Sequence, residues 1–147
     1  MQIMLLLSPA FATNQMMAKK FSCQGADINP PLKIRNIPAG TQSLALIMDD
    51  QDSPSGSWVH WIAYDIPPNN SIEENSRPGK PGINDFGDEW YCGPCPGYEP
   101  HRYVFTLYAL DTVLHLKQGA DKEILVKAMH GHILDKAELV GIYEREI

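Results

Sequence analysis

Residues 101–110 read HRYVFTLYAL, the clearest secondary-structure signal in the chain. The stretch is rich in aromatic and β-branched residues, which favour a pleated and half-buried strand. Because side chains alternate along a strand, His101, Tyr103, Phe105 and Leu107 share one face. We therefore predict a β-strand over residues 101–110 that carries two polar aromatic residues, His101 and Tyr103, at its start.

Two more strands are predicted upstream of this stretch. Residues 44–48 (LALIM) form a continuous apolar run that stops at Asp49 and Asp50, as expected of a buried strand that delivers acidic groups to its end. Residues 58–64 (WVHWIAY) form the second strand. Regular alternation there places Trp58, His60, Ile62 and Tyr64 on one face and Val59, Trp61 and Ala63 on the other, with both faces buried.

The rest of the chain supports a mainly β fold. Residues 3–7 and 138–146 are predicted as a first and a last strand, and residues 69–100 as a long, turn-rich connection. Asp121 can cap a helix that Gly131 ends, so one or two helices are expected late in the chain. A final helix from about residue 132 is the alternative to the last strand.

Length and charge exclude several classes of protein. The 147 residues, 44% hydrophobic and 20% charged, suit one globular domain over residues 1–147. Twelve basic and 18 acidic residues give a net charge of −6, which disfavours nucleic acid and anionic membrane as partners. The N-terminal apolar run that contains Leu5–Leu7 is only about six residues long, which is too short for a leader or a membrane span. We expect a cytoplasmic protein without stable membrane association.

The three cysteines are Cys23, Cys92 and Cys95, an odd number that cannot form a closed disulfide framework, so reduced thiols are expected. Residues 92–95 (CGPC) resemble the thioredoxin dithiol. That chemistry needs a helix after the first cysteine, whereas a proline-rich segment and a strand follow here. Packed thiols in a rigid loop are the favoured interpretation, and a redox protein using Cys92 and Cys95 is an alternative.

His60 lies inside one predicted apolar strand and His101 begins another, so a polar side chain at either position requires a structural or functional explanation. Asp50 ends a further predicted strand. Convergence of the three would give an anion pocket or a two-histidine, one-carboxylate metal site. From the residues alone, hydrogen-bonded core histidines are the more common outcome. A zinc site at His130 and His132 lacks obvious further ligands.

Four segments resemble the two signature regions of the phosphatidylethanolamine-binding protein family, which includes the Raf kinase inhibitor protein. They are residues 50–54 (DQDSP), 58–61 (WVHW), 93–96 (GPCP) and 101–105 (HRYVF). The bacterial and archaeal branch is indicated by residues 7–11 (LSPAF), 29–32 (NPPL), 84–87 (NDFG), 131–134 (GHIL) and 137–141 (AELVG). The resemblance runs from residue 5 to residue 145.

This resemblance implies a β-sandwich-like fold, with a large antiparallel sheet, a smaller second sheet and peripheral C-terminal helices. It also implies a small pocket for phosphate-type anions or phosphorylated headgroups. Carried over by position, the pocket residues are Asp50, Trp58, His60, Gly93, His101 and Tyr103. The family further suggests a homodimer and a role in modulating a kinase or protease.

In this pocket both histidines, the Tyr103 hydroxyl and a backbone N–H near Gly93 are expected to donate to the anion. Asp50 would orient a histidine and stabilise its protonated form, so affinity should fall as pH rises. Gln51, Ser53, Cys92 and residues 96–100 depart from the family pattern at the pocket rim.

No nucleophile with a base and an orienting group is identifiable, since Ser53, Ser55 and Ser57 lie in a turn-rich stretch. We therefore expect a binding module without a cofactor and not an enzyme. A metal-dependent enzyme using Asp50, His60 and His101 is the alternative.

Overall fold

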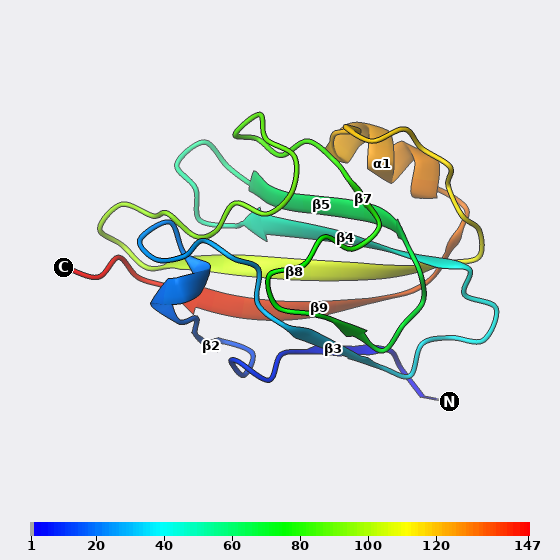
Figure 1. Ribbon diagram of the computed structural model, residues 1–147, viewed down its shortest axis with the longest axis horizontal. Coiled ribbons are helices and arrows are strands. Elements are labelled where there is room, and N and C mark those ends of the chain that lie inside the picture. Colours follow the sequence, from blue (N-terminus) through cyan, green and yellow to red (C-terminus); the bar gives the residue numbers. More distant parts are fainter. Residues whose placement is uncertain (1) are drawn as a thin grey trace.

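Two β-sheets pack face to face in the computed structural model, which describes residues 2–147 (Figure 1). Among these residues the larger sheet has the strand order β2-β9-β8-β4-β5-β7. Its strands are β2 (Gln15–Met16), β4 (Ser43–Asp50), β5 (Trp58–Ile66), β7 (Lys80–Pro81), β8 (His101–Leu110) and β9 (Ile133–Tyr143). The smaller sheet has the order β1-β3-β6 and consists of β1 (Leu5–Leu7), β3 (Leu32–Arg35) and β6 (Ser71–Ile72).

The predicted mainly β fold with a larger and a smaller sheet is confirmed, and one detail of the larger sheet differs. The short strand β2 runs parallel to β9, with Gln15 opposite Gly141, whereas the other pairs of this sheet are antiparallel. The larger sheet is therefore mixed. A two-residue strand carries too little pattern for its direction to be predicted.

Helices are few in the described chain. A 3-10 helix, η1, spans Lys19–Phe21, and α1 spans Lys122–Met129. As predicted, Asp121 caps α1, since its side chain accepts a hydrogen bond from the Ile124 N–H at 2.9 Å. A second C-terminal helix does not form, because residues 133–143 pair with β8 as strand β9. No helix among residues 2–147 has the length and hydropathy needed to cross a membrane.

Two apolar layers lie on opposite faces of the larger sheet. Between the sheets, Leu6 and Ile34 of the smaller sheet belong to one buried cluster with Leu46 and Phe105 of the larger. On the other face, Leu125 and Met129 of α1 pack in a second cluster with strand residues that include Ile47 and Ile62. Both faces of β4 and β8 are thus covered, which explains the continuous apolar runs in these strands.

A β-bulge interrupts strand β5 at His60. Asp49 of β4 pairs with Val59, and the next residue back, Met48, pairs with Trp61, so His60 is an extra residue. The predicted alternation is therefore wrong at this point. Val59 joins the cluster of Ile62 and Tyr64, whereas Trp61 packs in the cluster between the sheets.

The prediction of three reduced thiols is wrong. Cys23 and Cys95 form a disulfide with Cα atoms 5.4 Å apart, while Cys92 stays free within the described chain. The bonded residues are 72 positions apart, and their pairing depends on the tertiary fold, which local cysteine spacing cannot reveal. The disulfide joins the segment after η1 to the segment before β8.

Candidate functional site

A pocket of about 460 Å³ opens where β4 ends and β5 and β8 begin. These strand ends lie at the left of Figure 1. Because β4 runs antiparallel to β5 and β8, its end lies beside their starts. Asp50 is directly opposite Trp58 on one side and Tyr103 on the other. Asp50, Trp58, His60 and His101 line the pocket, which is walled by Ser53–Ser55, Phe86 and the 95–99 segment. The sheet register therefore brings together four of the six predicted residues.

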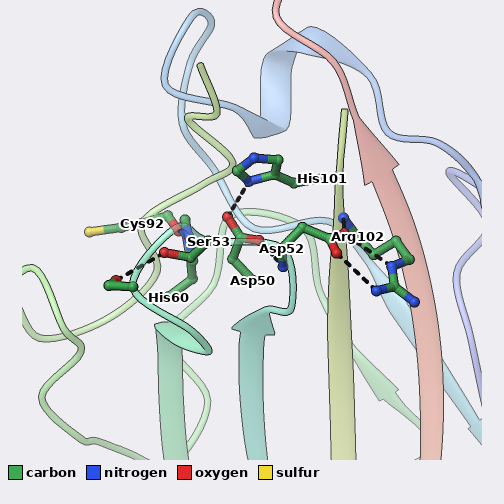
Figure 2. Close-up of polar contacts among 8 residues, drawn as sticks. Asp50, Asp52, Ser53, His60, Cys92, His101 and Arg102 are labelled. Carbon is green, nitrogen blue, oxygen red and sulfur yellow. Dashed lines mark hydrogen bonds and ion pairs between the residues drawn. The ribbon is translucent and has the colours of Figure 1, made fainter. Parts of the chain in front are cut away.

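Asp50 and His101 form a nearly buried pair, shown by a dashed line in Figure 2. The distance between His101 Nδ1 and Asp50 Oδ2 is 2.7 Å, and the two side chains are 12% and 7% exposed. Asp50 Oδ1 also accepts a hydrogen bond from the Asp52 N–H at 2.9 Å. Since a carboxylate accepts, His101 Nδ1 donates, and Nε2 is left for a ligand.

A second pair lies directly beside the first (Figure 2). Asp52 accepts hydrogen bonds from the Arg102 backbone N–H, Nε and Nη2 at 2.8, 3.0 and 2.8 Å. These contacts with Arg102 lower the pKa of Asp52 to about 2. The Arg102 guanidinium therefore connects the bend after β4 to the start of β8. It does not line the pocket.

His60 is fixed by the loop that precedes β8. Its Nδ1 lies 2.7 Å from the Cys92 carbonyl oxygen, and the Cys92 N–H donates to the His60 carbonyl at 3.1 Å. A carbonyl only accepts, so Nδ1 carries the hydrogen. His60 is 2% exposed, and burial lowers its pKa, although the Cys92 carbonyl and the Asp50 charge oppose this effect. The neutral ring therefore keeps a lone pair on Nε2.

The ring of Tyr103 packs against the rings of both pocket histidines. Its ring centroid is 5.3 Å from that of His60 and 6.3 Å from that of His101. The residue is fully buried, and its hydroxyl has no hydrogen-bond partner among residues 2–147. Burial and, after it, the Asp50 charge raise the tyrosine pKa, so the phenol stays protonated. Tyr103 therefore contacts both histidines but does not itself line the pocket.

Gly93 lies outside the pocket lining, which differs from the sequence-based expectation. Its N–H donates to Asp27 Oδ1 at 2.6 Å and is therefore already engaged. A Cβ at this position would lie 2.0 Å from the Phe21 carbonyl oxygen. Glycine is needed here for close packing of the loop against η1, and its backbone is not a free donor for an anion.

Sequence reasoning missed Phe86 and the residue that positions it, Asn84. Phe86 meets His60 edge to face with ring centroids 5.0 Å apart, and it contacts Trp58 in the same way. The buried Asn84 side chain donates to the His60 and Trp90 carbonyls and accepts from the Phe86 and Asp88 N–H groups. The Asn-Asp-Phe-Gly sequence at 84–87 is typical of such a turn. The contact of this turn with β5 depends on the tertiary fold, so the local sequence does not reveal it.

The two alternative chemistries gain no support from the geometry. Within residues 2–147 no three His, Cys, Asp or Glu side chains are arranged to hold one metal ion, although Asp50, His60 and His101 line the same pocket. Cys92 and Cys95 are not bonded to each other, and burial raises the pKa of the Cys92 thiol. A reactive thiol needs a lowered pKa. The next element after Cys95 is the strand β8 and not a helix.

The buried, neutral His60 predicts a loss of stability in acid. Its folded-state pKa lies below the unfolded value of about 6.5, so below that pH the unfolded chain binds the extra proton. As the pH is lowered below this value, the contribution of His60 should reduce the free energy of unfolding by up to about 1.4 kcal/mol per pH unit. The reduction should stop once the pH is below the folded-state pKa. Urea denaturation of wild type and His60→Phe at several pH values measures the difference. A wild-type curve parallel to that of the variant would contradict the assignment.

A two-sheet fold with a polar, partly aromatic pocket at adjoining strand ends is typical of small-ligand-binding proteins. The comparisons with known proteins are consistent with this class. The phosphatidylethanolamine-binding protein family model matches residues 7–144. A UPF0098 protein of Pyrococcus horikoshii is 46% identical over 97% of this chain and 77% of its own length. The chain belongs to the phosphatidylethanolamine-binding protein family.

Solved structures agree with this assignment. A phosphatidylethanolamine-binding protein homologue of Chlamydia trachomatis superposes with a TM-score of 0.96 at 42% identity, covering 99% of this chain and 100% of the other. YbcL of Escherichia coli, a member of the mammalian family, superposes with a TM-score of 0.89 at 24% identity over 99% and 100% of the two chains. The second likeness concerns the fold alone. Membership of the family supports a ligand-binding module.

Proposed function

We propose that the chain is a non-enzymatic binding module whose pocket holds a phosphate-type anion or phosphorylated headgroup. The observation that supports this most is the Asp50–His101 pair at the pocket wall. The Asp50 carboxylate lies 2.7 Å from Nδ1 and fixes the orientation of the ring, and a doubly protonated ring in this position would present Nε2–H and a positive charge to a ligand. Such a donor suits an oxyanion.

The pocket also lacks the parts of a hydrolytic centre. Ser53 and Ser55 lie at its wall with their hydroxyls 3.1 Å from each other, and neither is bonded to a histidine among residues 2–147. A serine nucleophile needs an adjacent general base. Binding is therefore the activity that these residues support. Calorimetric titration with phosphate and phosphoethanolamine tests the proposal, and it fails if neither ligand binds saturably.

Anion affinity is expected to fall as pH rises from 5.5 to 8. Histidine side chains ordinarily lose their proton in this range, and a neutral histidine at the position of His101 would offer no positive charge to the anion. The charged or titratable groups around it are Asp50, Asp52, Tyr103 and Glu99. Titration with sulfate, whose own charge is constant across the range, isolates the protein's contribution. Flat affinity would contradict a role for protonated His101.

Family membership extends the proposal to partners. We propose that the module modulates a kinase or protease, acts as a homodimer and resides in the cytoplasm. The Cys23–Cys95 disulfide counts against the cytoplasmic location, because disulfides are rare in a reducing cytosol outside hyperthermophiles. Sedimentation velocity over a range of concentrations tests the dimer, and non-reducing mass analysis of protein trapped with alkylating agent in its native cell tests the redox state.

A further inference from the structure

The two pocket histidines are held in different ways. His101 Nδ1 donates to a carboxylate, whereas His60 Nδ1 donates to the carbonyl of Cys92, each at 2.7 Å. A carboxylate carries a charge that stabilises an imidazolium, and a neutral carbonyl does so far less. His101 is therefore suited to donate from Nε2, and His60 is suited to accept there.

His60 has little freedom to change this role. The Cys92 N–H donates to the His60 carbonyl while the His60 ring donates to the Cys92 carbonyl, so two contacts fix the ring. Asn84 bonds to the same His60 carbonyl at 3.2 Å. The ring is 2% exposed and is flanked by Phe86 and Tyr103. Nε2 is the one polar atom of this side chain that is not already bonded within the described residues.

The remaining pocket charges also favour a ligand that brings a proton. Asp50 and Glu99 line the pocket, and within residues 2–147 no lysine or arginine does so. The Arg102 guanidinium donates two hydrogen bonds to Asp52 and does not line the pocket. A fully deprotonated oxyanion would place an oxygen lone pair against the lone pair of His60 Nε2 and near a carboxylate, with His101 and no lysine or arginine in the described lining to compensate.

We infer that the pocket selects an oxyanion that carries at least one O–H group, donating that hydrogen to His60 Nε2 while an unprotonated oxygen accepts from His101. The ligand class is inorganic phosphate or a singly protonated phosphate monoester. Phosphate diesters, including intact phospholipid headgroups, and sulfate lack the O–H and are disfavoured. This inference rests on the proposed anion-binding function and narrows it.

Competition between matched anions tests the selectivity. Four probes are titrated calorimetrically at about pH 6: inorganic phosphate, phosphoethanolamine, dimethyl phosphate and sulfate. A phosphate monoester has a second pKa of about 6, so a large share of phosphoethanolamine carries the hydrogen under these conditions. Phosphate and phosphoethanolamine should bind at least about tenfold more tightly than sulfate and dimethyl phosphate. The reason is that only the first two donate a hydrogen to His60 Nε2, whereas the others leave this buried acceptor unpaired.

His60→Phe removes the acceptor while keeping an aromatic ring of similar size. The variant should bind phosphate and sulfate within about threefold of each other, because the source of discrimination is gone. The matched control is His132→Ala, since His132 is paired with Asp111 at 2.8 Å away from the pocket lining and should leave selectivity unchanged. If His60→Phe does not fold, the four-probe series on the wild type still decides the question.

The outcomes separate this inference from the proposal beneath it. Equal binding of sulfate and phosphate by the wild type would overturn the selectivity and leave anion binding standing. Tighter binding of dimethyl phosphate than of phosphoethanolamine would also overturn it and would point to a diester headgroup. Absence of binding by all four probes would overturn both the anion pocket and its selectivity.

Discussion

Removal of the Cys23–Cys95 disulfide is expected to lower the free energy of unfolding by about 4 kcal/mol, given the 72-residue separation of the two cysteines. The bond restricts the unfolded chain, and this effect grows with the length of the closed loop. In the folded state it also ties the Cys95 wall of the pocket to the segment after η1. Urea denaturation of wild type and of the Cys23→Ser, Cys95→Ser double variant measures the loss.

Cys92→Ser is the matched control for this experiment, because Cys92 is free and half-buried. It should change stability far less than the double variant. Alkylation of unreduced, denatured wild type should label one thiol, and labelling of three would contradict the disulfide. Equal stability of wild type and double variant would contradict its structural role.

Replacement of His101 by alanine is expected to weaken phosphate binding by about 10- to 100-fold, the range for loss of a hydrogen bond that involves a charged group. The variant loses the donor at Nε2 and leaves Asp50 without its histidine partner. The remaining carboxylate then repels an anion. Calorimetric titration of phosphate into wild type and variant measures the change.

The chain offers a close control in His132→Ala. His132 is paired with Asp111 by the same Nδ1 contact, at 2.8 Å, but both side chains are exposed and neither lines the pocket. This variant should bind phosphate like the wild type. His101→Gln serves as a second test if alanine disturbs folding at the buried Asp50. Unchanged phosphate affinity in folded His101 variants would remove His101 from the binding site.

The central strands could be predicted because their signals are local. Residues 101–110 form β8 over the predicted range, since the pattern of aromatic and β-branched residues matches a strand covered on both faces. The β-bulge at His60 could not be predicted, because it depends on the register between β4 and β5. The Cys23–Cys95 pair was missed for a similar reason: its partners meet only through the tertiary fold.

The candidate site was predictable where it follows from strand register and not where it follows from loops. Asp50 and His101 could be placed at strand ends, and antiparallel pairing brings those ends together. Gly93 was assigned to the pocket by family position, yet its N–H is used by Asp27. Phe86 and the 95–99 wall come from the long connection, whose path has no periodic signal. The difference in role between the two histidines depends on which oxygen each Nδ1 meets.

The most direct test of the account is nuclear magnetic resonance of ¹⁵N-labelled protein titrated with phosphate. We predict saturable shifts of backbone amides around Asp50, Trp58, His101 and the 95–99 wall, where the pocket is lined. A competing basic surface exists, a hollow of about 540 Å³ lined by Lys33 and Arg35 on the smaller sheet. Shifts confined to that surface, or no saturable shifts, would contradict the proposed anion pocket.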